Sequence, residues 1–159
     1  MRGVLKFIEW TLIIIIGGFF ILVIFPHNWF ERDIQLQEYK REGIYQAVDL
    51  SSQSYYDGRI LIKGVAYGNG ELIVYMKGNG FGDVGKAPNM IKVTTDQGEE
   101  LDYGGGGSSN DLWSEHAYYV FRTVPNGIKQ ITITQPDDYI NGDTFSFTIN
   151  LQGGNQDDN

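Results

Sequence analysis

The stretch that decides the fold runs from Arg59 to Lys77 and reads RILIKGVAYGNGELIVYMK. Two runs rich in β-branched and aromatic residues lie on either side of a Gly-Asn-Gly turn at residues 68–70. An Asn-Gly pair favours positive φ at both positions, which suits the type I′ turn between two antiparallel strands. The stretch therefore predicts a β-hairpin with strands at residues 59–67 and 71–77.

Shorter runs of the same kind follow along the chain. In the last one, apolar and polar side chains alternate, which predicts one buried and one solvated face. The side chains expected inside are Phe145, Phe147, Ile149 and Leu151. With residues 44–50 as the first strand, the pattern gives about eight strands and no helices between them, which disfavours a parallel sheet. We expect a mainly β fold with an antiparallel, immunoglobulin-like β-sandwich over residues 44–152.

Two further turns are predicted to close hairpins. The turn at residues 96–98 would join strands 90–95 and 99–103, and the turn at 125–127 would join the two strands beside it. The glycine-rich residues 104–109 lie between these hairpins. Because glycine is depleted in strands and common in connections, we expect a flexible loop there.

The N-terminal part of the chain has a different character. Residues 10–25 form an apolar run without a charge, and its upstream extension takes in Lys6 and Glu9. The extended run reaches the length of about 20 residues that a helix needs to cross a bilayer. We predict a transmembrane helix over residues 7–26, with the lipid bilayer as its partner.

Flanking residues predict the orientation of this helix. Trp10 and Trp29 would lie ~28 Å apart in a continuous helix, close to the hydrocarbon thickness, and so at the two membrane interfaces. Arg2 and Lys6 precede the run, and no excess of positive charge follows it. By the positive-inside rule, residues 1–6 are a cytoplasmic N-terminus and the C-terminal domain is extracellular.

Two other interpretations of the N-terminus fit its residues less well. A cleavable signal peptide needs a small-x-small site after the apolar run, and none follows Phe25. Gly3 and Glu9 stand in the order found in pilins, but one residue too far apart. Gly17 and Gly18 lie in the middle of the run, where small residues let two helices approach and form an oligomer; they are also simply tolerated in membrane helices.

Between the apolar run and the first strand, residues 27–43 predict a juxtamembrane stalk. Asn28 followed by Glu31 resembles a capping box, and Trp29–Glu42 contains neither Gly nor Pro, which favours a helix. A strand is the alternative, because Ile34 and Leu36 alternate with glutamines. At the other end, residues 153–159 have nothing to bury and are expected to be a disordered tail.

A family resemblance rests on three segments after a predicted single-pass anchor: Phe121–Pro125, Ile131–Thr134 and Phe145–Ile149. Together they resemble the outer β-sandwich domains of membrane-anchored regulatory and envelope proteins of Gram-positive bacteria, including anti-sigma factors. The resemblance covers roughly the last forty residues and implies a domain displayed at the cell envelope. Anti-sigma factors also carry an inner domain that holds the sigma factor, and this sequence departs from them because only about six residues precede the predicted helix.

Composition excludes several kinds of chemistry. The chain has 12 Lys and Arg against 20 Asp and Glu, a net charge of −8, and contains no cysteine and two histidines. The lack of cysteine removes disulfides and thiol chemistry, and the acidic balance argues against nucleic-acid binding. We expect no enzymatic activity and no cofactor.

Two motifs bear on ligands. Gly80, Gly82 and Gly85 form a G-x-G-x-x-G pattern, but the chain returns to a strand instead of opening the helix that a phosphate site needs, so we interpret it as a wide β-connection. Asp137, Asp138 and Asp143 cluster around a turn and are candidate calcium ligands. Solvated carboxylates on a turn are the alternative.

The aromatic residues Trp113, Tyr118 and Tyr119 form the other candidate site, because such side chains stack on sugars or contact protein partners. Core packing is the alternative for each of them. The sequence thus favours a membrane-anchored, non-enzymatic accessory protein of the envelope that binds another envelope or membrane protein. The competing hypothesis is a ligand sensor or a module that binds carbohydrate or calcium.

Overall fold

The computed structural model describes residues 2–24, 34–81, 86–136 and 144–151. The described residues form a mainly β fold with antiparallel sheets. The elements in chain order are α1 (Arg2–Ile24), α2 (Ile34–Arg41), β1 (Tyr45–Ala47), β2 (Gln53–Tyr55), β3 (Gly58–Gly68), β4 (Glu71–Asn79), β5 (Lys92–Thr95), β6 (Asp102–Asn110), β7 (Ser114–Arg122), β8 (Gln130–Thr134) and β9 (Ser146–Asn150).

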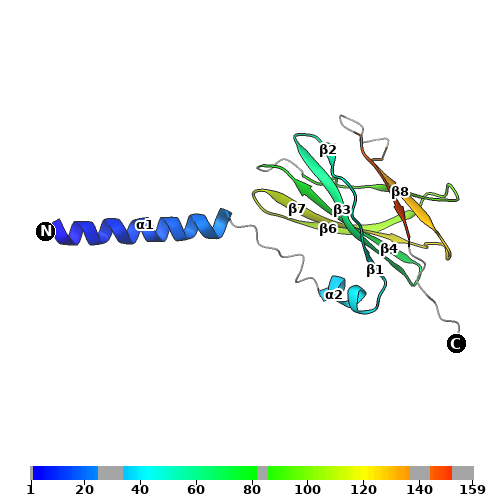
Figure 1. The fold of residues 1–159 in the computed structure, drawn as a ribbon, viewed down its shortest axis with the longest axis horizontal. Coiled ribbons are helices and arrows are strands. Elements are labelled where there is room, and N and C mark those ends of the chain that lie inside the picture. Colours follow the sequence, from blue (N-terminus) through cyan, green and yellow to red (C-terminus); the bar gives the residue numbers. More distant parts are fainter. Residues whose placement is uncertain (1, 25–33, 82–85, 137–143, 152–159) are drawn as a thin grey trace.

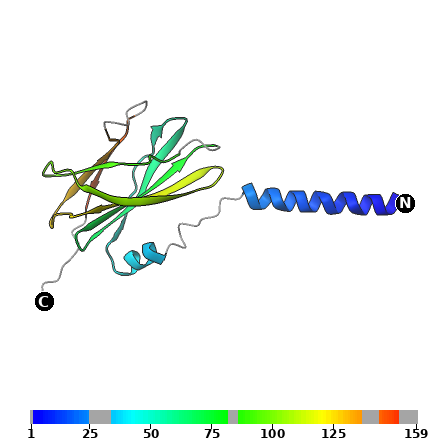
Figure 2. The same ribbon diagram turned by 180° about the vertical axis from the view of Figure 1, so that it is seen from behind.

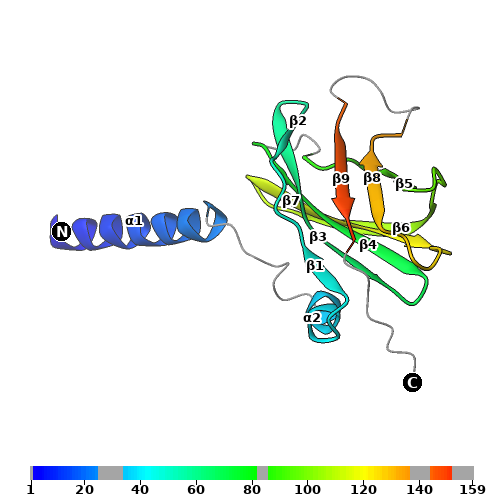
Figure 3. The same ribbon diagram turned by 45° about the vertical axis from the view of Figure 1, so that its right-hand side comes forward.

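The strands form two sheets that face each other (Figures 1 and 3). The larger sheet has the order β1-β3-β4-β7-β6, with β2 also paired to β3, and the smaller sheet has the order β5-β8-β9. One continuous core fills the space between them, with Val74 and Phe121 from the larger sheet and Ile131 and Phe147 from the smaller. Burial of these facing sides is the main source of stability for the β-domain.

The β3–β4 hairpin is confirmed at the residues that the sequence indicated. Asn69 and Gly70 both have positive φ, 54° and 76°, which are the dihedral signs of a type I′ turn. The two strands pair from Gly68 with Glu71 at the turn to Arg59 with Asn79 at the far end. In β9 the predicted alternation also holds: Phe147 and Ile149 within the strand, and Phe145 and Leu151 directly before and after it, are all buried.

Other connections differ from the prediction. The predicted hairpin at 96–98 is found in part: the N–H of Thr95 donates to the carbonyl of Glu99 at 2.8 Å, and Thr94 forms an antiparallel bridge with Glu100, before the chain continues into β6 of the other sheet. The segment at 123–129 carries the chain from β7 to β8 in the other sheet and does not close a hairpin. The buried side chains of these two connections, Leu101, Val124 and Ile128, belong to the shared core, which explains the crossing. Residues 104–109, predicted to be a loop, lie in β6. Six strands in one sheet and three in the other also depart from the four-and-three division of an immunoglobulin constant domain.

The glycines of β6 are explained by close neighbours and not by chain flexibility. A Cβ atom built on Gly106 would lie 2.5 Å from the carbonyl oxygen of Tyr118, and one on Gly107 would lie 3.0 Å from the Tyr118 ring. A Cβ on Gly104 would meet the side chain of Arg122 at 2.9 Å. Atoms of Tyr118 and Arg122 in β7 therefore occupy the space that side chains at these positions would need. Glycine at these positions allows β6 to pair with β7 as a strand.

The predicted stalk is only partly found. Helix α2 lies within it, but its Leu36 is buried against Ala66, Ile73 and Tyr75 on the outer face of the larger sheet. Figure 3 shows α2 beside β1. The physical reason is that β4 has apolar residues on both faces, and α2 covers the face that the smaller sheet does not reach. Thus α2 is part of the packed domain.

The transmembrane prediction for residues 7–26 is wrong in the described structure. Within the described residues, no helix has both the length and the apolar character that a membrane crossing requires. Large apolar side chains of α1, such as Phe7, Trp10 and Phe19, are exposed in this structure. The predicted single-pass anchor is corrected accordingly, and the location of the two ends of the chain stays a prediction.

The other N-terminal predictions concern individual residues. Trp10 is exposed in α1, and Gly17 and Gly18 have open space around their α-carbons. Trp29 lies outside the described residues, as does the predicted tail at 153–159. The pairing of two tryptophans at membrane interfaces therefore has no structural support.

The contact between α2 and the sheet predicts the effect of Leu36→Ala. Loss of a buried leucine side chain should lower the free energy of unfolding by about 2 kcal/mol, at the low end of the range for core leucines because α2 can shift to fill the space. Leu50→Ala, at a leucine that is 36% exposed, is the control and should change it by less than about 0.5 kcal/mol. Urea denaturation measures both. Equal effects would mean that α2 is not anchored through Leu36.

Candidate functional site

Two exposed aromatic rings lie together at one end of the β-domain. Phe81 follows β4, and Trp113 lies in the turn between β6 and β7. Their ring centroids are 4.9 Å apart with the planes tilted by 52°, and the two residues are 68% and 44% exposed. Large aromatic side chains that remain in water while contacting each other are a typical feature of protein-binding surfaces. We call Phe81 and Trp113 the aromatic pair.

The turn that carries Trp113 is held by the carboxylate of Asp111. Its Oδ1 accepts hydrogen bonds from the backbone N–H groups of Trp113 and Ser114, both at 2.7 Å, and its Oδ2 accepts one from the Ser114 hydroxyl at 2.9 Å. The N–H of Asp111 donates to the carbonyl of Ser114 at 2.8 Å. Aspartate favours such turns because its short side chain reaches the backbone two and three residues ahead.

Lys86 ties the same turn to the rest of the domain. Lys86 is only 4% exposed, and its ammonium group donates to the backbone carbonyl of Asp111. The backbone N–H groups of Lys86 and Ala87 donate to Oε2 of Glu115 at 3.0 and 2.9 Å. A buried ammonium needs such an acceptor because an unpaired buried charge is costly. The polar groups of Lys86 therefore fix the position of the β6–β7 turn.

Contacts from β4 complete this support. Gly80 donates its N–H to the carbonyl of Trp113 at 3.0 Å, which places Phe81 next to Trp113. A Cβ atom built on Gly78 would lie 2.0 Å from the carbonyl oxygen of Lys86. Only glycine fits there, so Gly78 allows the chain at Lys86 to pack directly on β4. The aromatic pair thus stands on a backbone that is fixed on three sides.

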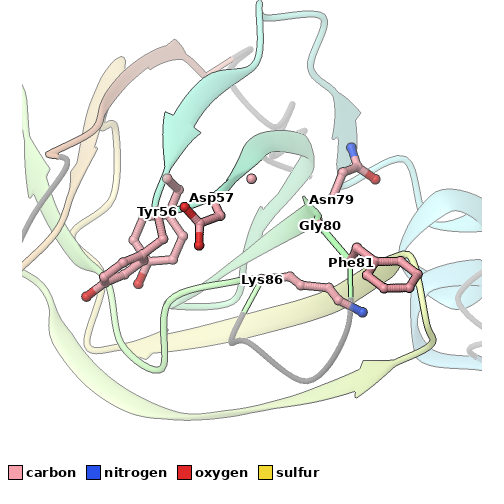
Figure 4. A pocket seen from close by; sticks show the side chains of 8 residues that line it. Tyr56, Asp57, Asn79, Gly80, Phe81 and Lys86 are labelled. Atoms are coloured by element: carbon pink, nitrogen blue, oxygen red, sulfur yellow. The ribbon is translucent and has the colours of Figure 1, made fainter.

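A small cavity lies beside Phe81 and is shown in Figure 4. Its volume is ≈ 50 Å³, and its lining comes from the β2–β3 turn, the end of β4 and Lys86. The Lys86 side chain extends toward the Phe81 ring, whereas Tyr56 and Asp57 lie on the other side of the cavity. Burial, with smaller effects from Tyr56 and Glu115, raises the pKa of Tyr55 to about 12, so its hydroxyl stays protonated at neutral pH. The cavity has room for water and little more.

A second cavity, of ≈ 120 Å³, lies on the inner face of β6 and β7. Residues Tyr103, Ser108, Glu115 and Tyr119 supply its polar lining, and Pro88 faces them. The hydroxyl of Tyr119 donates to the carbonyl of Pro88, and burial raises the pKa of Tyr119 far above its ordinary value. This hydroxyl therefore has a structural role. It holds the segment after Lys86 against β7.

The three aromatic residues predicted to form a site are not brought together. Trp113 belongs to the aromatic pair, but Tyr118 is half-buried on the outer face of the larger sheet and Tyr119 is buried in the core between the sheets. Their separation follows from strand geometry, since neighbouring side chains point to opposite faces. By the same geometry Glu115 and His116 diverge, as the sequence indicated.

The candidate calcium ligands Asp137, Asp138 and Asp143 all lie outside the described residues. In the part of the chain that the structure describes, no group of three or more His, Asp or Glu side chains is placed to hold a metal ion. The calcium hypothesis therefore stays a prediction. Gly82 and Gly85 of the G-x-G-x-x-G pattern also fall outside the described part, and Gly80 follows the last residue of β4.

Sequence reasoning missed Phe81, Lys86 and Asp111. For Asp111 a signal was present, because an Asp followed three residues later by Ser is typical of a side chain that caps a turn. For Lys86 there was none, because its burial depends on the carbonyl of Asp111, which lies in the β6–β7 turn far along the sequence. The proximity of Phe81 to Trp113 depends likewise on the pairing of β4 with β7.

Comparison with known proteins gives no relative. No model of a protein family, no curated protein and no solved structure matches this chain. The candidate site must therefore be judged by its own geometry.

The hydrogen bonds of Asp111 predict a pH-dependent contribution to stability. Burial raises the pKa of Asp111, but the bonds from Trp113 and Ser114 and the charge of Lys86 outweigh it, so the pKa lies below the ordinary 3.8. A lowered folded-state pKa stabilises the protein above the unfolded-state pKa, and this stabilisation is lost as the pH falls through the folded-state pKa. Asp111→Ala should therefore cost about 1–2 kcal/mol at pH 7 and less below about pH 4.

Urea denaturation at several pH values measures this difference. Asp49→Ala, at an exposed aspartate, is the control and should change the free energy of unfolding by less than about 0.5 kcal/mol throughout. A cost for Asp111→Ala that is the same at pH 3 and pH 7 would contradict the proposed role of the carboxylate.

Proposed function

We propose that this chain is a non-enzymatic interaction protein that binds another protein through the aromatic pair. The observation that carries the proposal is that Phe81 and Trp113 are exposed while the backbone beneath them is fixed by Asp111, Lys86 and Gly80. Binding then requires little ordering of the chain, which lowers its entropic cost. Tryptophan is also among the residues that most often dominate the energy of a protein interface.

The geometry of the pair favours a protein over a sugar. The two rings are inclined by 52°, so they do not form one flat surface on which a pyranose ring could lie. The wedge between them suits an irregular apolar side chain. The polar groups near the pair, Asp111, Ser114 and Lys86, are occupied with backbone contacts. They support the rings and leave no convergent set of donors for sugar hydroxyls.

The nature of the partner is proposed from charge and from the sequence resemblance. A net charge of −8 disfavours nucleic acid and anionic polymers and favours a neutral or basic protein surface. The similarity of three segments to outer domains of Gram-positive envelope proteins supports an envelope or membrane protein as the partner. The aromatic pair is the part of the surface on which this hypothesis can be tested.

The test is quantitative capture of partners by the tagged full-length chain in cells of its source, after chemical crosslinking. We expect one stoichiometric partner, and Trp113→Ala and Phe81→Ala should each reduce its capture at least tenfold, which corresponds to about 1.4 kcal/mol of binding energy. Trp113→Phe keeps a ring and should retain most of the capture. Leu50→Ala is the control for loss of an apolar side chain elsewhere. Equal capture by Trp113→Ala and the unchanged chain would contradict the proposal.

A further inference from the structure

The outer edge of β6 has the features of a strand that can accept another strand. Among the described residues β6 pairs only with β7, and it is the end strand of the larger sheet. Figure 2 brings the β6–β7 hairpin to the front. The other end strands are much shorter, with three residues in β1, four in β5 and five in β9, against nine in β6. Long unprotected edges are rare because they invite pairing.

The composition of β6 also leaves this edge open. From Tyr103 to Asn110 the strand has no charge and no proline, the two devices that most often protect an edge. Residues 104–107 are all glycine. An incoming strand would therefore meet no side chain of these four residues. A register shift between Tyr103 and Gly105 interrupts one end, but the pairing from Gly106 to Asn110 is unbroken.

The register of the hairpin identifies the backbone groups that face outward. The N–H of Asp111 donates to the carbonyl of Ser114, so this pair is a hydrogen-bonded one. In an antiparallel ladder such pairs alternate, so Ser109 and Gly107 also bond to β7. The N–H and C=O groups of Gly106, Ser108 and Asn110 then point away from β7. They are three successive donor and acceptor sites for an added strand.

The cavity of ≈ 120 Å³ lies beside this edge. Gly106 and Ser108 line it from β6, and Glu115, Ala117 and Tyr119 line it from β7. The hydroxyl of Tyr103 and the carbonyl of Tyr118 lie directly beside Gly106, so the free space of the cavity lies next to these groups. An added strand would place every second side chain on this face, and an engineered cavity of about 150 Å³ holds benzene. The cavity therefore has room for one side chain of moderate size.

The charges around β6 distinguish two possible occupants of its edge, a second copy of this chain and a segment of another protein. Acidic side chains outnumber basic ones around β6: Glu99, Glu100, Asp102, Asp111 and Glu115 against Lys86, Lys92 and Arg122. In antiparallel pairing of two copies of β6, Asp102 of each copy would approach Asp111 of the other. Like charges across a strand pair are destabilising. A second copy of this chain is thus disfavoured, and an extended segment with basic ends is favoured.

We propose that the edge of β6 binds an extended, basic segment of a partner protein by strand addition. The backbone groups of Gly106, Ser108 and Asn110 hold the segment, the acidic residues at the two ends of β6 attract its flanks, and the cavity receives one of its side chains. The proposal deepens the proposed function by naming the kind of segment that is bound. It uses backbone groups of β6 and not the rings of the aromatic pair, so the two proposals can fail independently.

The probe is a fluorescent peptide of sequence Lys-Thr-Val-Thr-Val-Thr-Val-Thr-Lys, titrated against the full chain. Ser108→Pro replaces an outward N–H by a ring and keeps the bonds to β7, so it should weaken binding at least tenfold. Ser108→Ala keeps the N–H and is the matched control, with an expected change below twofold. Leu50→Ala, at a residue outside β6 and β7, should also bind the peptide within twofold.

The charge argument has its own comparison. A peptide with glutamate in place of both lysines should bind at least tenfold more weakly at low salt, and a rise in ionic strength from 0.05 to 0.5 M should reduce the difference. A peptide that carries N-methyl groups on the central Val and the adjacent Thr has both edges blocked and should not bind. This comparison needs no protein variant, so it decides the matter even where Ser108→Pro does not fold.

Three results would overturn the proposal. The first is equal peptide binding by Ser108→Pro and Ser108→Ala when both are folded, as judged by circular dichroism and melting temperature. The second is binding of the N-methylated peptide. The third is a dimer of the unchanged chain in sedimentation that Ser108→Pro abolishes, because the occupant of the edge would then be a second copy.

Discussion

The burial of both faces of β4 is the constraint on which the rest of the structure depends. Leu72, Val74 and Met76 are buried on one face, and Ile73 and Tyr75 on the other. A strand of this kind cannot lie at an edge or on a solvated surface. It requires neighbours on both sides and a cover on each face. The pairing with β3 and β7, the smaller sheet over one face and α2 over the other all satisfy this requirement.

The two proposed binding surfaces lie at the margins of this packed region. At the end of β4 the chain leaves the core at Phe81, and the adjacent β6–β7 turn brings Trp113 beside it. At the edge of the sheet β6 is supported from one side only. The two surfaces differ in chemistry, since one offers aromatic side chains and the other offers backbone groups. The two surfaces share a support. The backbone N–H groups of Lys86 and Ala87 donate to Glu115 in β7, and the ammonium group of Lys86 donates to Asp111 in the β6–β7 turn.

The polar network around Lys86 shows how buried charge can serve geometry. The ammonium group donates to the backbone carbonyl of Asp111, and the carboxylate of Asp111 accepts from the N–H groups of its own turn. Buried groups satisfied in this way rigidify a region, because each alternative arrangement would leave a donor or an acceptor without a partner. An exposed aromatic pair on such a base loses little freedom on binding. The network therefore links the packing of the domain to its proposed activity.

Local sequence determined the features that local physics controls. The Asn-Gly turn at 69–70, the alternation of β9 and the divergence of Glu115 and His116 each depend on a few neighbouring residues, so they could be predicted. The partition of strands between two sheets, the strand at 104–107 and the burial of Lys86 could not. Each of these depends on contacts between residues far apart in the sequence: Tyr118 over Gly107, Asp111 beside Lys86, and a core shared by Val74 and Phe147.

Apolar runs alone were also insufficient, because the run near the N-terminus predicted a membrane span that the described helix does not provide. Hydrophobicity indicates that a segment must be covered, and only the tertiary structure decides by what.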